Sequence, residues 1–207
     1  MIVAIVPAAG KSQRMGRPKL LLPLGPCRDI EHVLDALANS RVDRTIVVLP
    51  PDADELLSVV SQFEVESVQL AAATPDMRSS VLCGLERAEM LSGVEKPTGF
   101  LVALADQPTL SARIVDQLID RSRGSTPPHP CPSPPAAGGE GLGVRGVPTA
   151  RSHGSKSVFI PTHQGKRGHP VLFSWSLAPR VRAIPSDCGL DWLINQLGEE
   201  VEEFLVD

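Results

Sequence analysis

The stretch IVAIVPAAGKSQRMGRPK, residues 2–19, decides the fold class. Residues 2–6 are apolar at every position, which is typical of a strand buried on both faces of a parallel sheet. The small residues Ala8, Ala9 and Gly10 follow, and small side chains let a ligand approach the backbone closely. The stretch therefore predicts a buried strand that leads directly into a ligand-binding loop.

This loop matches neither of the two common glycine motifs for phosphate binding. The triplet Gly-Lys-Ser at 10–12 ends like a P-loop, but Ile5 stands where that motif requires a glycine. The glycines at Gly10, Gly16 and Gly25 also lack the G-x-G-x-x-G spacing of a dinucleotide-binding turn. The sequence therefore indicates another class of phosphate-handling loop.

Basic side chains are concentrated around the same loop. Residues 1–28 contain five Lys or Arg and no Asp or Glu, although the whole chain has a formal net charge of −4. Ser12 offers a hydroxyl, Arg14 a planar guanidinium that fits phosphate oxygens, and Lys19 a compact positive charge. These groups suit a nucleoside triphosphate, and the alternative is a solvated basic loop. The acidic balance of the chain argues against a nucleic-acid partner, which needs an extended basic face.

Apolar runs alternate with amphipathic stretches along most of the chain, which indicates an α/β protein. We expect a three-layer α/β/α arrangement in which helices cover both faces of a mainly parallel, Rossmann-like sheet. The expected strands are 2–6, 45–49, 67–73, 100–105, 157–161 and 169–174, with an edge strand in 199–207. The expected helices are 29–40, 52–63, 79–91, 111–123 and 188–197.

We interpret residues 1–207 as a single domain with one flexible insertion at 124–155. The insertion is rich in Pro, Gly and Ser and has too few large apolar residues to offset the entropy cost of ordering it.

The four cysteines contain no C-x-x-C pair, which argues against a zinc ribbon and a disulfide framework. No apolar run approaches the roughly 20 residues of a membrane span, and the N-terminus lacks a basic signal-peptide start, so we expect a cytoplasmic protein without a membrane partner.

Asp106 is the candidate metal ligand. It follows the apolar run 100–105, where a carboxylate is costly unless it is paired or bound to a cation. Because the carboxyl ends of parallel strands share one edge of a sheet, we expect this segment to meet the loop at 7–19. Mg²⁺ bound to phosphate oxygens is a suitable partner for one carboxylate. The alternative is a turn or helix-capping Asp before Pro108.

Two further segments are candidates for substrate contacts. Residues 77–85 read as a helix start with Ser79 or Ser80 as the cap, where exposed N–H groups suit a base, a ribose or a phosphate, although capping alone explains the serines equally well. Residues 163–174 place basic side chains between glycines before a strand. This segment suits a second anionic substrate, and the alternative is a basic hairpin turn.

Four segments together resemble the MobA-like and MocA-like nucleotidyltransferases, and the match is closest to the molybdenum-cofactor cytidylyltransferase branch. The segments are PAAGKSQRMGRPKLLLPLG (7–25), MRSSVLCGL (77–85), LADQP (104–108) and GKRGHPVLF (165–173). The resemblance spans about 1–123 and 157–200 and implies a nucleotidyltransferase fold of the GT-A-like type. It implies Mg²⁺-dependent transfer of a nucleotidyl group from an NTP to a phosphate of molybdopterin or a related cofactor, with release of pyrophosphate.

The resemblance also implies a role for individual residues. Ala9 favours CTP over GTP, because Ala-Ala-Gly at the opening goes with CTP in the family. The acceptor is a phosphorylated pterin, and a client molybdoenzyme is a possible partner. The implied nucleotide contacts are Ala8, Ala9, Gly10, Lys11, Ser12, Ser79 and Ser80; the implied catalytic residues are Arg14, Lys19 and Asp106, with Asp106 as metal ligand; and the implied acceptor contacts are Arg167, Gly168, His169 and Pro170.

Two departures from the family pattern leave an alternative open. The family continues into an Asp-x-Asp-Thr-Pro stretch with a second metal carboxylate, whereas this sequence stops at Asp207. We therefore expect a truncated C-terminus, and Asp187 or Asp191 is the candidate substitute for the missing carboxylate. Asp191 also replaces a basic residue of the family. The alternative is a non-catalytic module that binds nucleotide or cofactor, and an isoprenoid or sugar-phosphate nucleotidyltransferase ranks lower because of GKRGHP (165–170).

Overall fold

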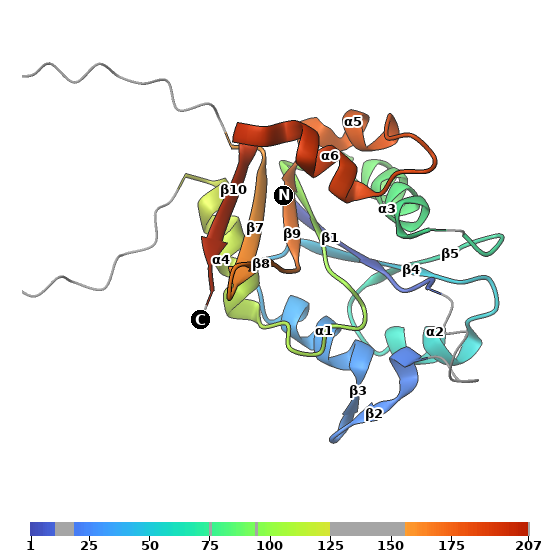
Figure 1. The fold of residues 1–207 in the computed structure, drawn as a ribbon. Coiled ribbons are helices and arrows are strands. Elements are labelled where there is room, and N and C mark those ends of the chain that lie inside the picture. Colours follow the sequence, from blue (N-terminus) through green and yellow to red (C-terminus); the bar gives the residue numbers. More distant parts are fainter. Residues whose placement is uncertain (11–18, 75, 94, 125–155, 207) are drawn as a thin grey trace, which may run out of the picture.

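One sheet with strand order β10-β7-β9-β6-β1-β4-β5 forms the middle of the molecule, and β8 pairs with β7 (Figure 1). The computed structural model describes residues 1–10, 19–74, 76–93, 95–124 and 156–206. The strands of this sheet are β1 (Ile2–Pro7), β4 (Arg44–Leu49), β5 (Glu66–Gln69), β6 (Gly99–Val102), β7 (Val158–His163), β8 (Lys166–Arg167), β9 (Val171–Ser174) and β10 (Val201–Leu205).

The sheet is mostly parallel, as the apolar runs predict. Strand β1 is parallel to both β4 and β6, β4 is parallel to β5, and the edge strand β10 is parallel to β7. Strand β9 is the exception, because it runs antiparallel to both β6 and β7. The expected edge strand within 199–207 is therefore confirmed, while the reversed direction of β9 was not anticipated.

Helices cover both faces of the sheet, so the expected three-layer α/β/α architecture is confirmed (Figure 1). On one face, Ile2, Ala4 and Val6 of β1 share a core with α1, α2 and α4. On the other face, Val3 and Ile5 share a core with α3, α5 and α6. This alternation explains why β1 is apolar at every position. The helices are α1 (Asp29–Ala38), α2 (Asp54–Val60), α3 (Met77–Leu91), α4 (Ala112–Ser122), α5 (Ala178–Arg182) and α6 (Leu190–Leu197).

Several local elements differ from the expectations. Asp76 caps α3 and accepts a hydrogen bond from the Ser79 N–H, so the expected Ser79 or Ser80 cap is wrong. Asp and Ser are comparable capping residues, and the one that precedes the first helical turn takes the position. The sequence also missed α5, the small hairpin of β2 (Pro23–Leu24) and β3 (Cys27–Arg28), and the short helical turns η1 (Lys19–Leu21), η2 (Trp175–Leu177) and η3 (Gly198–Glu200).

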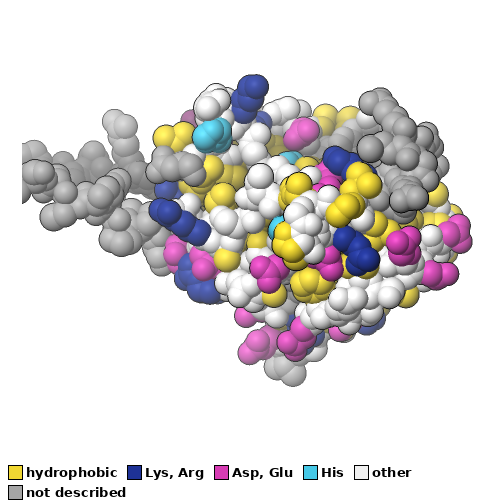
Figure 2. All heavy atoms as spheres, turned by 90° about the horizontal axis from the view of Figure 1, so that it is seen from below, with side chains coloured by type: hydrophobic (Ala, Val, Ile, Leu, Met, Phe, Trp, Pro, Cys, Tyr) yellow, Lys and Arg dark blue, Asp and Glu magenta, His cyan; other side chains and the backbone are white. Residues whose placement is uncertain are grey.

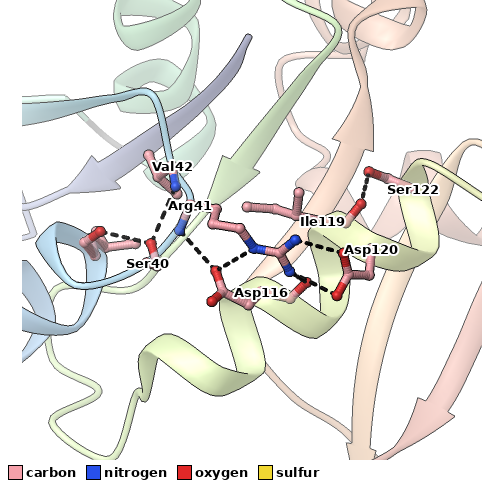
Figure 3. Close-up of polar contacts among 8 residues, drawn as sticks. Ser40, Arg41, Val42, Asp116, Ile119, Asp120 and Ser122 are labelled. Carbon is pink, nitrogen blue, oxygen red and sulfur yellow. Dashed lines mark hydrogen bonds and ion pairs between the residues drawn. The ribbon is translucent and has the colours of Figure 1, made fainter. Parts of the chain in front are cut away.

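Arg41 ties the connection between α1 and β4 to helix α4 (Figure 3). Its guanidinium donates two hydrogen bonds of 2.7 Å to the Asp120 carboxylate and lies 3.4 Å from Asp116. The hydrogen bonds from Arg41 hold the pKa of Asp120 below its usual value. Arg41 therefore joins two elements on the same face of the sheet.

The expected insertion at 124–155 lies outside the described residues except for Gly124. Cys27, Cys83 and Cys188 are free thiols, as their spacing suggested, and burial raises the pKa of Cys83. In the part of the chain that the structure describes, no helix is long and apolar enough to cross a membrane.

Candidate active site

The candidate site lies where β1 and β6 end. The N–H of Ala103, just after β6, donates to the Ile5 carbonyl at 3.0 Å, and the N–H of Ala8, just after β1, donates to the Val48 carbonyl at 2.8 Å. These bonds hold the starts of both loops at one edge of the sheet. Loops at the carboxyl ends of parallel strands commonly bind ligands, so this edge is the place to look for chemistry.

The backbone after β1 approaches the surface through small residues. Ala8 and Ala9 are buried, whereas Gly10 is exposed. A Cβ added at Gly10 would meet no other described atom within 4 Å. Packing within the described residues therefore does not account for this glycine. Lys11, Ser12 and Arg14, which the sequence assigns to nucleotide and phosphate, lie outside the described residues.

Lys19 and Asp106 form an ion pair at the centre of the candidate site. Lys19 begins the turn η1, and Asp106 lies in the turn after β6. The Lys19 Nζ atom lies 3.0 Å from the Asp106 Oδ2 atom, although 87 residues separate them. Their side chains are 49% and 45% exposed. The two segments thus meet at one edge of the sheet, as the strand pattern predicts.

Asp106 is not a helix cap. Helix α4 is capped by Ser111, whose hydroxyl accepts from the Ile114 N–H. The backbone around Asp106 forms a turn in which the Gln107 N–H donates to the Leu104 carbonyl at 3.3 Å. The turn alternative is therefore right for the backbone, while the carboxylate points to Lys19 and leaves half of its surface accessible to solvent.

His169 lies beside this centre, in the segment that leads into β9. Burial lowers its pKa below the usual value, and the Val102 backbone and the carboxylates of Asp191 and Asp106 only partly offset this effect. The Nδ1 atom of His169 is buried and has no hydrogen-bond partner among the described residues. The neighbouring Gly168 donates its N–H to the Pro161 carbonyl at 2.8 Å, which holds the segment against β7. The imidazole is therefore a mainly neutral group at the edge of the site.

Arg167 has protein partners at its guanidinium. Its Nε donates to Glu203 of β10 at 2.8 Å, and its Nη1 donates to Asn195 of α6 at 3.2 Å. Gln164 and Gly165 form the turn between β7 and β8, so the hairpin alternative describes the backbone here. A contact between Arg167 and an acceptor would have to compete with Glu203 and Asn195.

The two serines at the start of α3 are tied to their surroundings in different ways. The Ser79 hydroxyl donates to Asp76 at 2.9 Å, inside the helix cap. Ser80 is 2% exposed, and its hydroxyl lies 3.5 Å from that of Thr74. Sequence reasoning missed Asp76 and Thr74, although an Asp three residues before Ser79 is a recognisable capping signal.

The carboxylate of Asp106 fits a cation that takes most of its ligands from a bound substrate. Among the described residues, no group of three His, Cys, Asp or Glu side chains is arranged to hold a metal, and neither Asp187 nor Asp191 completes one with Asp106. Mg²⁺ often binds proteins through one or two carboxylates and takes its other ligands from substrate phosphates and water. Asp106, accessible and at the edge of the sheet, suits that role.

The surface does not present a continuous basic face in the view of Figure 2. Lysines and arginines alternate there with acidic side chains and hydrophobic patches. Nucleic-acid binding depends on an extended positive surface, so this view offers no support for such a partner.

Solved structures with the same fold include nucleotidyl transferases. Rv0371c from Mycobacterium tuberculosis H37Rv superposes with a TM-score of 0.71 and 20% identity, covering 100% of this chain and 88% of that chain. A nucleotidyl transferase from Methanothermobacter thermautotroptrophicus gives a TM-score of 0.68 and 23% identity, with 100% and 88% covered. At these identities the likeness concerns the fold alone.

Curated relatives include proteins named 2-C-methyl-D-erythritol 4-phosphate cytidylyltransferase. The Nitrosospira multiformis protein is 35% identical over 121 residues, which are 56% of this chain and 52% of that protein. The Rhodococcus jostii protein is 27% identical over 207 residues, which are 99% of this chain and 85% of that protein. The chain thus spans about half the length of the first curated relatives it matches.

The family assignment rests on a match along nearly the whole chain. The model of the MobA-like NTP transferase domain matches residues 4–201, which include most of β1, the turn with Asp106 and the segment with His169. The resemblance noted from the four sequence segments is confirmed at this level, and we conclude that the chain belongs to the MobA-like NTP transferase domain family.

Proposed function

We propose that this protein transfers a cytidylyl group from CTP to a phosphate of a small acceptor and releases pyrophosphate, with the help of a divalent cation. The observation that carries the proposal is the meeting of Lys19 and Asp106 at the carboxyl ends of β1 and β6, in a chain of an NTP transferase family. The names of the curated relatives support a cytidylyl donor.

The reaction is a substitution at phosphorus. An oxygen of the acceptor phosphate bonds to the α-phosphorus of CTP, and the bond between that phosphorus and the oxygen leading to the β-phosphate breaks. Such transfers depend on alignment of the reactants and on stabilisation of negative charge rather than on a covalent enzyme intermediate. When bound, a cation held by Asp106 supplies positive charge to the phosphates.

The residues of the site divide into three proposed roles. Lys19 contacts phosphate oxygens, together with Arg14. The backbone of Ala8, Ala9 and Gly10, with Lys11 and Ser12, lies against the nucleotide, and Ser79 and Ser80 border the nucleoside. Two observations support this placement of the nucleotide: Gly10 is exposed, and a Cβ added there would meet no described atom within 4 Å.

The divalent cation is proposed as Mg²⁺. One neighbour of this fold, with a TM-score of 0.67 and 20% identity, is titled as a complex with manganese. Mn²⁺ accepts the same oxygen ligands as Mg²⁺ and is therefore a suitable probe of the same site.

The acceptor is proposed to lie along 167–170, beside His169. Two phosphate monoesters are candidates. Molybdopterin is favoured by the resemblance of this segment to the molybdenum-cofactor branch, and 2-C-methyl-D-erythritol 4-phosphate is favoured by the names of the curated relatives. Both acceptors offer the same reacting group, so the choice between them depends on the rest of the acceptor.

Pyrophosphate release measures this function directly. The purified chain is incubated with CTP, GTP or ATP, Mg²⁺ and either acceptor, beside Asp106→Asn and the matched control Glu95→Gln, an exposed acidic residue that precedes β6 at its other end. We expect CTP-selective release with one acceptor, a loss of at least about tenfold in Asp106→Asn, and wild-type release in Glu95→Gln.

The outcome also separates the two acceptors and the binding-module alternative. Release with only one acceptor identifies the acceptor class. Binding of CTP without release, with both acceptors, would contradict catalysis and favour a module that only binds nucleotide. Full turnover in Asp106→Asn would show that Asp106 has no role in the reaction.

A further inference from the structure

The Lys19–Asp106 contact has a consequence for the order in which ligands enter the site. We propose that Lys19 is a removable counter-ion of Asp106, which keeps a free divalent cation out of the empty site and makes the site accept the cation together with the nucleotide. This inference rests on the proposed function, because it assumes that Asp106 binds the cation.

The geometry places the two positive charges in competition for one carboxylate. The ammonium lies 3.0 Å from Oδ2 of Asp106, within hydrogen-bond distance. A divalent cation on the same carboxylate would lie within a few ångströms of that ammonium, and like charges at such distances repel. Lys19 therefore has to move before Asp106 can bind a cation tightly.

A nucleoside triphosphate gives Lys19 a new partner. The lysine side chain has a flexible stem and is 49% exposed, so its ammonium is accessible to phosphate oxygens. Lys19 begins η1 and reaches Asp106 at the edge of the sheet where β6 ends, beside the end of β1, where the nucleotide is proposed to bind. Phosphate oxygens that attract the ammonium release Asp106, so the arriving nucleotide prepares the cation site.

A purely structural role explains this pair less well. The Arg121–Glu202 pair is less exposed, at 28% and 29%, and Arg121 also lies 4.3 Å from the centre of the Phe204 ring, so it fastens the edge strand β10 to α4. Lys19 and Asp106 join two turns at a solvent-exposed edge instead. Exposed ion pairs contribute little to folding stability, so a role in ligand binding explains the Lys19–Asp106 pair better than a role in stability does.

Binding of Mn²⁺ alone tests the inference. Free Mn²⁺ is measured by electron paramagnetic resonance during titration of wild type, Lys19→Met, Lys19→Arg and Asp106→Asn, first without and then with CTP. Lys96→Met is the matched control, because Lys96 is exposed and precedes β6 at the opposite end from Asp106. Circular dichroism checks that each variant is folded.

Without CTP, we expect Lys19→Met to bind Mn²⁺ about two- to fivefold more tightly than wild type, the range that removal of an exposed ion pair implies. Lys19→Arg and Lys96→Met should bind it as wild type does. With CTP, the gain in Mn²⁺ affinity should be larger in wild type than in Lys19→Met. In wild type the ammonium of Lys19 moves from Asp106 to the phosphates, whereas Lys19→Met has no ammonium to move.

Two results separate the inference from the proposed function. If Lys19→Met binds Mn²⁺ no more tightly than wild type while Asp106→Asn loses the site, the counter-ion role is wrong and the cation site stands. If Asp106→Asn binds Mn²⁺ with CTP as tightly as wild type does, the cation site itself is wrong, and the counter-ion role fails with it.

Discussion

At the scale of single residues, two side chains of the same type differ in their properties because their surroundings differ. His163 and His169 both lie in the segment 163–174, but His163 is exposed on β7, whereas His169 is half-buried and its Nδ1 atom has no partner in the described part of the chain. Burial favours the neutral imidazole of His169. A neutral imidazole is suited to hydrogen bonding rather than to permanent charge pairing.

The lowered pKa of His169 predicts a loss of stability in acid. Its folded-state pKa lies below the unfolded value of 6.5, so the unfolded chain binds more protons as the pH falls below 6.5. The contribution of neutral His169 is fully present above 6.5 and decreases as the pH falls toward the folded-state pKa. We expect His169→Gln to lose less stability than wild type across this range.

Urea unfolding well above and well below pH 6.5 measures the effect. His163→Gln is the matched control, since it removes an exposed histidine of the same segment and should keep the wild-type pH dependence. An unchanged pH dependence in His169→Gln would show that the ring protonates equally well in the folded and unfolded chain.

At the scale of elements, close approach between a helix and a strand fixes the middle of the fold. Helix α3 lies against β1 at Gly84, where an added Cβ would stand 2.5 Å from Cγ2 of Ile5. Ile5 is fully buried, and its branched side chain is stiff, so it cannot swing aside as a lysine can. The glycine therefore sets the distance between α3, which carries Ser79 and Ser80, and the strand that leads into the site.

Gly84→Ala is expected to destabilise the protein. Overpacking a tight core costs about 1–3 kcal/mol, while replacing glycine inside a helix returns about 1 kcal/mol. The overpacking term is the larger, so we expect a net loss of up to about 2 kcal/mol in the free energy of unfolding. Gly189→Ala is the control, because a Cβ there meets no described atom within 4 Å. Equal or higher stability in Gly84→Ala would contradict the close contact.

At the scale of the whole molecule, the site depends on segments that only the folded chain brings together. Lys19 belongs to the segment after β1, and Asp106 follows β6, 87 residues later in the chain. A ligand that contacts both therefore binds the folded state and not the unfolded chain, and its binding energy adds to stability.

Stabilisation by CTP and Mn²⁺ follows from this arrangement. At a concentration of CTP near 100 times its dissociation constant, we expect the free energy of unfolding to rise by about 2.7 kcal/mol. The increase should be largely lost in Asp106→Asn and retained in Glu95→Gln. Thermal or urea unfolding with and without the ligands measures it, and equal stabilisation of Asp106→Asn and wild type would place the ligands elsewhere.

The sequence alone was sufficient for the fold class and for the convergence of the two segments that follow β1 and β6. Continuous apolar runs identify buried parallel strands, and the runs at 2–6, 46–49 and 100–105 appear in β1, β4 and β6. Since parallel strands end at one edge, the strand pattern predicted that the segments 7–19 and 106–108 converge, and the contact between Lys19 and Asp106 confirms that convergence. These features depend on periodicity and chain direction, which the order of residues contains.

Tertiary structure decided the direction of β9, the cap of α3 and the partners of the charged groups. Asp76 rather than Ser79 caps the helix, Arg167 pairs with Glu203, and Arg41 pairs with Asp120. Each choice depends on which of several chemically equivalent groups lies within hydrogen-bond distance after folding. Local sequence contains the donors and acceptors but not the distances between them, because packing of elements far apart in the chain sets those distances.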